Sequence, residues 1–478
     1  MDFAGVVLAG GLGKRMNSSI PKVLHTIFGK PMIQYVLDTL YALKPAKVIV
    51  VAGRHIKEIK NSVKEKGQTI FVKQEEAKGT ADALMNALPA LKGFNESIIV
   101  VNGDTPLIVK NTLKKLLTLH KRKGNIISLL SFVANEPGSY GRIIRNKNDE
   151  LLSIVEDRDA TESQKKIREV NSGIYAIEPE ALDILKEIKL NKSKGEYYLT
   201  DIIEIAKNKG LKVDAFCFTS EEELIGVNTL QELDRVRQIM KERIIKRWID
   251  KGVNFMDTSS VFISPDVSIG KDTFIYPNVY IEGNTRIGKG CYIYPNVRIF
   301  NSIIKDGVYI KDSTLIEESI VKNNASIGPF ARIRPGSVIG KGARIGNFVE
   351  VKKSVIGSGT KAGHLTYLGD SKIGKNVNIG AGTITCNYDG YNKHITYIEN
   401  DVFIGSDSQL IAPVRICKGA YVGAGSTITK NVPSMSLALS RVKQTNIKDW
   451  VTKRRLKVKT EKLQMKGAKS TGQKAKDR

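Results

Sequence analysis

The chain has 478 residues, of which 41% are hydrophobic and 26% charged, with a formal net charge of +26 at pH 7. This length predicts roughly two to four domains with sizeable cores, and the absence of any apolar run near about 18 residues argues against a membrane span. Residues 1–11 lack a basic lead and a cleavage site, so they predict a first strand and not a secretory signal. The four cysteines are widely spaced and form no C-x-x-C pair, which favours a reducing, cytoplasmic setting without disulfides.

The first half alternates apolar runs with helical patterns. Strands are predicted at 3–9, 47–52 and 97–101, and helices at about 32–42 and 80–88. This alternation is typical of βαβ units, so we expect residues 1–228 to form a Rossmann-like α/β domain with a mostly parallel sheet. The amphipathic stretch at 229–251 predicts a single linker helix behind it.

A glycine-rich loop, LAGGLGKRM at 8–16, follows the first strand. Glycines let backbone N–H groups approach phosphate oxygens, and Lys14 and Arg15 add positive charge. The loop matches neither the Walker motif nor the dinucleotide fingerprint. A phosphate cradle and a plain strand–helix turn therefore both remain open on this pattern alone.

Asp104 lies in the run NGDTP, directly after an apolar strand. Sites of α/β folds gather at the carboxyl ends of such strands, and a carboxylate there suits Mg²⁺. The alternative is that Asp104 only caps a helix or completes a turn.

The second half repeats every six residues. Aliphatic residues recur without a slip at Ile263, Ile269, Ile275, Ile281, Ile287, Ile293 and Ile299, and the period returns at 327–351 and 404–428. A period of six is neither that of a helix nor that of a single strand. It predicts a parallel β-helix over residues 252–440, in which three short faces make a coil and each coil buries the aliphatic residues of its neighbours. The repeat is interrupted at 364–369 and 386–397, which predicts loops that carry function.

His364 lies in the first interruption and is one of five histidines in the chain. Neutral imidazole suits a general base near pH 7, for instance one that deprotonates an amine attacking a thioester. Arg334, Lys352 and Lys361 would suit a sugar phosphate nearby. A lone histidine can also be structural, but a zinc site in this half would need three histidines and only His364 and His394 are present.

Residues 441–478 form a basic tail with 14 Lys/Arg against 3 Asp/Glu. The segment is polar and poor in aromatic residues, so we expect it to be largely disordered. No nucleic-acid-binding motif accompanies the charge, so no specific nucleic-acid partner is expected.

The first half resembles the sugar-1-phosphate nucleotidylyltransferases. The resemblance rests on the glycine loop followed by Pro21-Lys22, and on further segments in the family's order: Gln74, 79–80, 102–104, 140–142, 155–156, 171–173 and 226–228. It implies that UTP and the nucleotide sugar contact Leu8, Ala9, Gly10, Gly11, Lys22, Gln74, Gly79, Thr80, Asp104, Gly141, Glu156, Asn171 and Asn228. It also implies that Asp104 and Asn228 hold Mg²⁺. Gly10, Lys14 and Asn102 depart from the residues common in the family, which we expect to tune nucleotide contacts.

With the six-residue repeat behind it, the chain to about Asp449 resembles a bacterial bifunctional family. That family joins N-acetylglucosamine-1-phosphate uridylyltransferase to glucosamine-1-phosphate N-acetyltransferase on a left-handed β-helix, and supplies UDP-N-acetylglucosamine for peptidoglycan and lipopolysaccharide precursors. The match AGHLTYLGD at 362–370 and NVNIGAGTITCNYDG at 376–390 carries this resemblance.

The same resemblance implies roles in the second half. His364 is the implied general base. The implied glucosamine-1-phosphate ligands are Arg334, Lys352, Tyr367 and Asn378, and the implied acetyl-CoA groove comprises Ala381, Asn387, Tyr388, Ser406, Ala424 and Arg441. A homotrimer with the acetyltransferase site between subunits is also implied.

Two other functions remain as alternatives. In one, the chain is a nucleotidylyltransferase whose β-helix is only structural or regulatory. That alternative assigns no role to His364. In the other, it is a non-enzymatic regulatory subunit, as in translation-factor exchange complexes of similar architecture. That alternative leaves the glycine loop, Asp104 and His364 unexplained.

Overall fold

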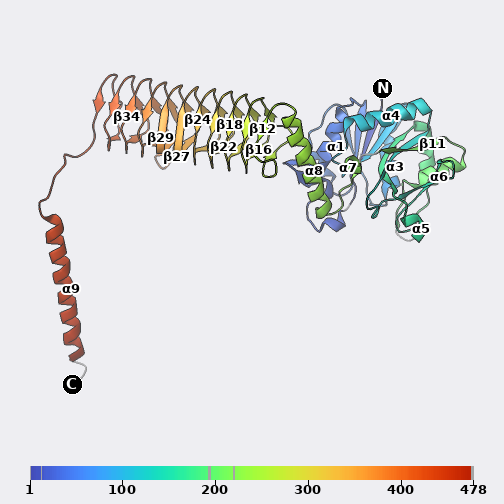
Figure 1. Ribbon diagram of the computed structural model, residues 1–478, viewed down its shortest axis with the longest axis horizontal. Helices are drawn as coiled ribbons and strands as arrows, with labels where there is room; N and C mark the ends of the chain where they lie inside the picture. Colours follow the sequence, from blue (N-terminus) through green and yellow to red (C-terminus); the bar gives the residue numbers. More distant parts are fainter. Residues whose placement is uncertain (1, 12, 192–194, 219–220, 475–478) are drawn as a thin grey trace. The chain divides into compact units, whose positions relative to one another are not determined.

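The computed structural model describes residues 2–11, 13–191, 195–218 and 221–474 (Figure 1). The chain divides into two compact units, Met1–Gly342 and Ala343–Arg478. Every helix within the described residues is too short or too polar to cross a membrane.

The first unit begins with a nine-stranded sheet of order β11-β7-β10-β6-β1-β4-β5, to which β8 and β9 add a ribbon through β10. The strands along this order are parallel except β10, which runs antiparallel to β6 and β7. The bounds are β1 (Ala4–Leu8), β4 (Lys47–Ala52), β5 (Thr69–Lys73), β6 (Ile98–Asn102), β7 (Ile127–Val133), β8 (Arg142–Arg145), β9 (Leu151–Val155), β10 (Glu169–Ile177) and β11 (Val213–Phe218). The expected α/β fold with a mostly parallel sheet is confirmed.

Helices cover both faces of this sheet. One hydrophobic core joins the sheet to α1 (Met32–Tyr41), α2 (Ile56–Ser62) and α4 (Lys110–Lys123). A second core joins it to α3 (Thr80–Leu91), η3 (Pro179–Glu187) and α6 (Asp201–Asn208). The short helices are η1 (Lys14–Met16), η2 (Lys22–Leu24), α5 (Glu162–Lys165) and α7 (Glu221–Leu224). Since the strands are buried between two helical layers, polar groups are available mainly at their ends.

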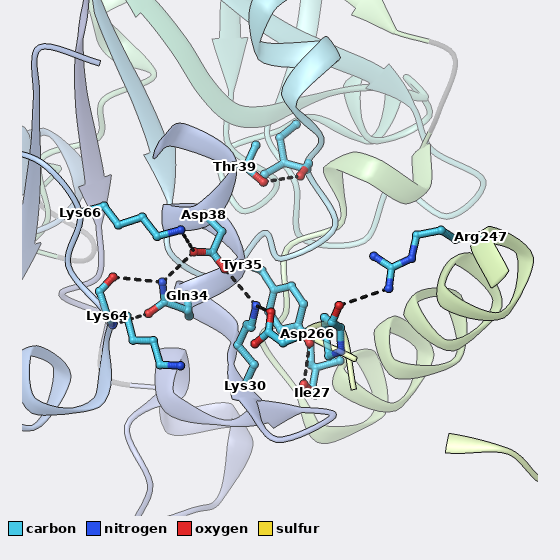
Figure 2. Close-up of polar contacts among 12 residues, drawn as sticks. Ile27, Lys30, Gln34, Tyr35, Asp38, Thr39, Lys64, Lys66, Arg247 and Asp266 are labelled. Atoms are coloured by element: carbon cyan, nitrogen blue, oxygen red, sulfur yellow. Dashed lines mark hydrogen bonds and ion pairs between the residues drawn. The ribbon is translucent and has the colours of Figure 1, made fainter. Parts of the chain in front are cut away.

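The hairpin β2 (Thr26–Ile27) and β3 (Lys30–Pro31) is fastened by polar contacts (Figure 2). Lys30 Nζ lies 3.0 Å from a carboxylate oxygen of Asp38 on α1 and 3.0 Å from one of Asp266, which lies in the repeat region. The Tyr35 hydroxyl donates to the carbonyl of Ile27 over 2.7 Å. These contacts anchor the segment that follows Lys22.

Helix α8 (Leu230–Ile249) corresponds to the expected linker helix. It begins with a capping box in which Thr229 and Glu232 satisfy each other's backbone N–H groups. Its apolar side chains Leu233 and Val236 pack with Met16 and Ile27 of the first domain in a third core.

The rest of the first unit is a stack of parallel coils. Phe262 and Ile263 pair with Tyr280 and Ile281, one coil later, and the repeating isoleucines are buried. The strands are β12 (Asn254–Phe255), β13 (Phe262–Ile263), β14 (Ser268–Ile269), β15 (Phe274–Ile275), β16 (Tyr280–Glu282), β17 (Arg286–Ile287), β18 (Tyr292–Ile293), β19 (Arg298–Phe300), β20 (Ile303–Ile304), β21 (Tyr309–Ile310), β22 (Leu315–Glu317), β23 (Ile320–Val321), β24 (Ser326–Ile327), β25 (Arg332–Ile333) and β26 (Val338–Ile339). The β-helix expected from the six-residue period is confirmed.

The second unit contains further coils of the same kind. Their strands are β27 (Arg344–Lys352), β28 (Val355–Ile356), β29 (Lys361–Gly369), β30 (Ser371–Ile373), β31 (Asn378–Ile379), β32 (Ile384–Cys386), β33 (Thr396–Ile398), β34 (Phe403–Ile404), β35 (Gln409–Ile411), β36 (Val414–Ile416), β37 (Tyr421–Val422), β38 (Thr427–Ile428) and β39 (Leu437–Ala438). Residues 364–369, expected as a loop, instead lie in the nine-residue strand β29, whereas 387–395 do leave the coils.

The basic tail differs from its expected disorder. Trp450–Lys474 form helix α9, with no helix-breaking proline in the segment. Lysine, arginine, leucine and glutamine are good helix formers, so local propensity accounts for the helix without a packed core. Charge and low aromatic content predicted disorder, but the helix propensity of these residues outweighs them.

Candidate active sites

A cavity of about 520 Å³ opens at the carboxyl ends of β1 and β6. Most of the residues expected to bind nucleotide line it, namely Leu8, Ala9, Gly10, Gly11, Lys22, Gln74, Gly79, Thr80, Asp104 and Glu156. They come from segments that are far apart in sequence, and the parallel sheet brings their ends to one edge. Leu12 of the glycine loop lies outside the described residues.

Gly10 lies directly against the side chain of Gln74. A Cβ built on Gly10 would lie 2.3 Å from Gln74 Oε1. The Gln74 side chain is 3% exposed, and its Nε2 donates to the Gly79 carbonyl over 3.2 Å and to Asp82 over 2.7 Å. The Gln74 amide is therefore held in one orientation beside the loop, as a group that reads the edge of a base must be.

Lys22, Asp104 and Asn228 converge in the same cavity. The Lys22 ammonium forms an ion pair with Asp104 and donates to Asn228 Oδ1 over 3.0 Å. The Lys22 and Asp104 side chains are only 12% and 14% exposed. Asn228 is fixed in turn because its backbone N–H donates over 2.6 Å to Glu232 at the start of α8.

The donor set fits a magnesium ion that shares its coordination with a substrate. Two oxygen-bearing side chains, Asp104 and Asn228, already meet around one cation. No cluster of three or more His, Cys, Asp or Glu side chains suited to a metal occurs in the described part of the chain. Magnesium commonly binds through one or two carboxylates with phosphates and water as the other ligands, so this sparse set suits it.

The residues expected to hold the sugar lie next to one another. Asn171 N donates to the Gly141 carbonyl over 2.9 Å, and a Cβ on Gly141 would lie 3.5 Å from Glu156 Oε1. Thr200 donates to the Glu156 carboxylate over 3.1 Å. Gly141, Asn171 and Asn228 are absent from the cavity lining itself. Asn228 contacts Lys22 and Gly141 lies beside Glu156, both of which line the cavity, whereas Asn171 contacts Gly141.

Glu196 and Tyr198 also line the cavity, and the sequence argument missed them. Burial, followed by the charges of Glu196 and Glu156, raises the pKa of Tyr198 to about 12. The hydroxyl therefore remains a hydrogen-bond donor at neutral pH. No spacing marks these residues in the sequence, because only the fold brings their segment beside Thr80, whose hydroxyl accepts from Leu199 N over 3.0 Å.

In the second unit, Lys352, His364 and Tyr367 lie on β27 and β29, and Asn378 of β31 pairs with Lys361 of β29. Strands β27 and β29 pair in parallel, with Asn347 opposite His364 and Lys352 opposite Gly369. Lys352 Nζ lies 3.7 Å from Asp370, which also accepts a hydrogen bond from Asn387 Nδ2. Asp370 therefore links a predicted sugar-phosphate ligand to a predicted acetyl-CoA ligand, a role that the sequence argument did not assign.

His364 is exposed at the surface of β29. Its Nδ1 lies 2.5 Å from the side-chain oxygen of Asn347, and its carbonyl accepts a hydrogen bond of 2.7 Å from the buried Thr366 hydroxyl. The ring is thus held at the surface and is not packed into the interior. Asn347 was not among the predicted residues. Arg334 follows β25 in the first unit, so its role remains a prediction.

Three predicted acetyl-CoA residues form what we call the corner column: Ala381, Ser406 and Ala424 on successive coils. The Ala381 carbonyl accepts from Asp407 N over 2.7 Å, and the Ser406 carbonyl accepts from Gly425 N over 2.8 Å. The Ala424 carbonyl accepts from Arg441 Nη1 over 3.0 Å.

Glycines precede each member of the corner column. A Cβ on Gly380 would lie 2.4 Å from Ser406 N, and one on Gly405 would lie 2.4 Å from Ala424 N. Small residues therefore follow one another along this corner, where the backbones of successive coils pack closely.

Tyr388 lies in the loop at 387–395 and is 59% exposed. Its hydroxyl donates to the Gly390 carbonyl over 2.5 Å. Asp389 braces the loop from inside: hydrogen bonds from the Asn392 backbone and the His394 side chain lower the pKa of Asp389 to about 2. The loop is ordered by its own contacts and presents an aromatic ring at the surface.

Family comparisons match both halves of the chain. Residues 5–167 match the MobA-like NTP transferase domain, and residues 395–430 match the bacterial transferase hexapeptide (six repeats). Residues 246–351 match the EIF2B subunit epsilon LbH domain, and residues 315–389 match the GMPPB C-terminal domain.

Curated relatives match nearly the whole chain. A bifunctional protein GlmU of Thermodesulfovibrio yellowstonii is 54% identical over 450 residues, which is 94% of this chain and 99% of that protein. Proteins of the same name from Halalkalibacterium halodurans and Caldicellulosiruptor saccharolyticus are 44% and 45% identical, over 94% of this chain and 98% and 97% of their own lengths.

Proposed function

Because the chain belongs to the family of bifunctional GlmU proteins, we propose that it catalyses two successive steps on one sugar phosphate. It acetylates glucosamine-1-phosphate with acetyl-CoA, and then transfers UMP from UTP to the N-acetylglucosamine-1-phosphate so formed, with release of pyrophosphate. The product, UDP-N-acetylglucosamine, feeds the precursors of peptidoglycan and lipopolysaccharide. The observation that carries the proposal is that the two units hold two different candidate sites, a cavity at the carboxyl ends of β1 and β6 in the first and a surface imidazole on β29 in the second.

Uridylyl transfer brings two polyanions together, so the site must screen negative charge and align the attacking oxygen with the α-phosphate. Gly10 and Gly11 of the loop offer backbone N–H groups to the phosphates. Gln74 reads the uracil through its amide, while Glu156 and Asn171 hold the sugar. Lys22 supplies a positive charge at the point where the phosphates meet.

Magnesium is the metal that the donor set favours, with Asp104 and Asn228 as its protein ligands. When bound, it would neutralise phosphate charge as a hard Lewis acid. Lys22 contacts both of these residues, and we propose that its ammonium also contacts the substrate phosphates.

Acetyl transfer needs a base for the sugar amine as it attacks the thioester carbonyl. His364 Nε2 accepts the proton, the new amide C–N bond forms, and the C–S bond breaks to release CoA. Lys352, Tyr367, Asn378 and Arg334 bind the sugar phosphate. The corner column, Asn387, Tyr388 and Arg441 line the path of the coenzyme.

We propose a cytoplasmic homotrimer whose subunits complete one another's acetyltransferase sites. Phe348 and Leu365, beside the candidate base, expose 56% and 62% of their surface, which suits burial against another copy of the chain. The proposed domain limits are 1–228, 229–251, 252–440 and 441–478. The bounds of α8 and the last coil strand, Leu437–Ala438, support them.

A paired assay tests the proposal. The purified chain is given glucosamine-1-phosphate and acetyl-CoA while free thiol is followed, and then N-acetylglucosamine-1-phosphate, UTP and Mg²⁺ while pyrophosphate is followed. Both products are expected. Pyrophosphate without thiol would leave a nucleotidylyltransferase with a structural β-helix, and neither product would favour the regulatory alternative.

A further inference from the structure

Asn347 and His364 occupy equivalent corners of successive coils. They lie 17 residues apart and face each other in the parallel register of β27 and β29. The residues that follow them, Phe348 and Leu365, both have positive φ, 55° and 46°. Bulky residues rarely adopt this conformation, so the same uncommon turn is made twice, one coil above the other.

The close packing of the two corners fixes this alignment. A Cβ on Gly346 would lie 1.8 Å from the Gly363 carbonyl oxygen, so the two backbones approach as closely as glycine permits. The Thr366 hydroxyl, donating to the His364 carbonyl over 2.7 Å, holds the histidine backbone from the other side. The 2.5 Å contact between His364 Nδ1 and Asn347 Oδ1 is thus built on two rigid strands.

We propose that Asn347 is a positioning residue for acetyl transfer, which fixes the tautomer of His364 by accepting a hydrogen bond from Nδ1–H. A neutral imidazole has one N–H and one lone pair, and an amide oxygen can only accept. The proton therefore resides on Nδ1, and the lone pair that takes the proton of the sugar amine is on Nε2. The inference rests on the proposed acetyltransferase activity and adds a residue to it.

An asparagine suits this position better than a carboxylate. A carboxylate beside an imidazole favours the protonated ring, which is not a base. An amide oxygen orients the ring without that charge. Other ionisable side chains on the two strands are Arg344, Glu350, Lys352, Lys361 and Tyr367. They are common to the wild type and to every variant at position 347, so a difference between these proteins reports on position 347 alone.

The test compares Asn347→Ala and Asn347→Asp with a control, Val355→Ala, in the full-length protein. Val355 is 45% exposed on β28, in a different sheet from β27 and β29. Thiol release gives kcat and KM for acetyl transfer, and pyrophosphate release shows that the first unit is intact. NMR of the imidazole nitrogens, in protein grown on labelled histidine, reports the tautomer. His364→Ala identifies the resonance of the base.

For Asn347→Ala we expect kcat for acetyl transfer to fall roughly tenfold or more, with KM little changed, as when a histidine loses the group that orients it. The NMR signal should change from the Nδ1–H form to a mixture. Asn347→Asp should keep the Nδ1–H form and, at high pH, should have a higher kcat than Asn347→Ala. The acid limb of its pH–rate profile should lie at higher pH than that of the wild type. Val355→Ala should match the wild type.

Three outcomes separate the possible failures. If wild type releases thiol and Asn347→Ala has the same kcat and the same tautomer, the positioning role is wrong while the acetyltransferase stands. If wild type releases no thiol, the proposed activity itself is wrong. An equal loss of acetyl and uridylyl transfer in Asn347→Ala would indicate general damage to the fold and would also overturn the positioning role.

Discussion

Lys22 and Asp104 form an ion pair at the carboxyl end of β6, although 82 residues separate them in the chain. Asn228 joins them from the start of α8, with its Oδ1 3.0 Å from the same ammonium. The two oxygen-bearing groups are therefore preorganised around a positive charge before any substrate binds. Such preorganisation is what a site that gathers phosphate charge requires.

Asp104→Ala should abolish Mg²⁺-dependent pyrophosphate release and leave acetyl transfer unchanged, because only the first unit loses a ligand. Binding of Mn²⁺, followed by its electron paramagnetic resonance signal, should weaken in the same variant. A normal uridylyl rate with unchanged Mn²⁺ binding would show that the metal ligands were assigned wrongly.

His364→Ala should reduce acetyl transfer by roughly 10²-fold or more, the scale expected when a general base is removed. Uridylyl transfer should survive, since the residue lies in the second unit. Paired initial rates check both statements. A joint loss of the two activities in a folded variant would contradict the assignment of two separate sites.

Gly79→Ala should impair the uridylyl site more than the addition of one methyl group would suggest. Gly79 has φ of 102°, and an added Cβ would lie 2.4 Å from the backbone oxygen of Tyr197, which cannot move aside as a side chain could. The control is Gly67→Ala, with φ of 62° and open space around it, which should cost only the ~1–2 kcal/mol of a left-handed residue. Gly79→Ala should have a lower urea midpoint and a higher KM for UTP than Gly67→Ala. Equal midpoints and equal KM values would show that the structure relaxes around the Tyr197 contact.

Truncation after Asp449 removes α9 and should leave uridylyl transfer intact. The described α9 side chains, up to Met465, are almost entirely exposed, so few buried contacts are lost. Pyrophosphate release by the truncated and full-length chains provides the measurement. A large decrease would assign the tail a role that its exposure does not suggest.

Stability should fall as the pH drops below about 6.5 because of His120. Burial lowers the pKa of His120, against the opposing charge and hydrogen bond of Glu178. The unfolded chain takes up the proton first, so stability is complete above the unfolded value near 6.5 and declines as the pH falls towards the folded value. One proton contributes a slope of at most ~1.4 kcal/mol per pH unit. Urea midpoints between pH 7.5 and 5 should fall less in His120→Gln than in wild type, and parallel curves would exclude His120 as the cause.

The sequence correctly predicted those parts of the structure that a single local pattern determines. The six-residue spacing of isoleucines predicted the coils, because each aliphatic side chain must be buried by its neighbour one coil away. The glycine loop and NGDTP predicted the edge at which the cavity opens, because parallel strands end together. Glu196 and Tyr198 could not be found this way, since only the tertiary fold brings their segment to that edge.

Asn347 could have been found from the sequence with one more step. Neighbouring coils are offset by 17 or 18 residues, as in Arg286↔Ile303 and Ser268↔Arg286. Counting back 17 from His364 gives Asn347. The helical tail was missed for a different reason, since charge and composition outweighed intrinsic helix propensity in the argument.

The corner column stays in register across an insertion in the chain. Ala381 and Ser406 remain in register although residues 387–395 leave the coils between them, because that excursion begins and ends beside the same turn. Changing the length of the excursion between Tyr388 and His394 should leave Ala381 and Ser406 in place, because His394 N donates to the Asn387 carbonyl over 2.8 Å and closes the excursion at its base. Related chains should therefore vary more in the length of this excursion than in the number of coils on either side of it.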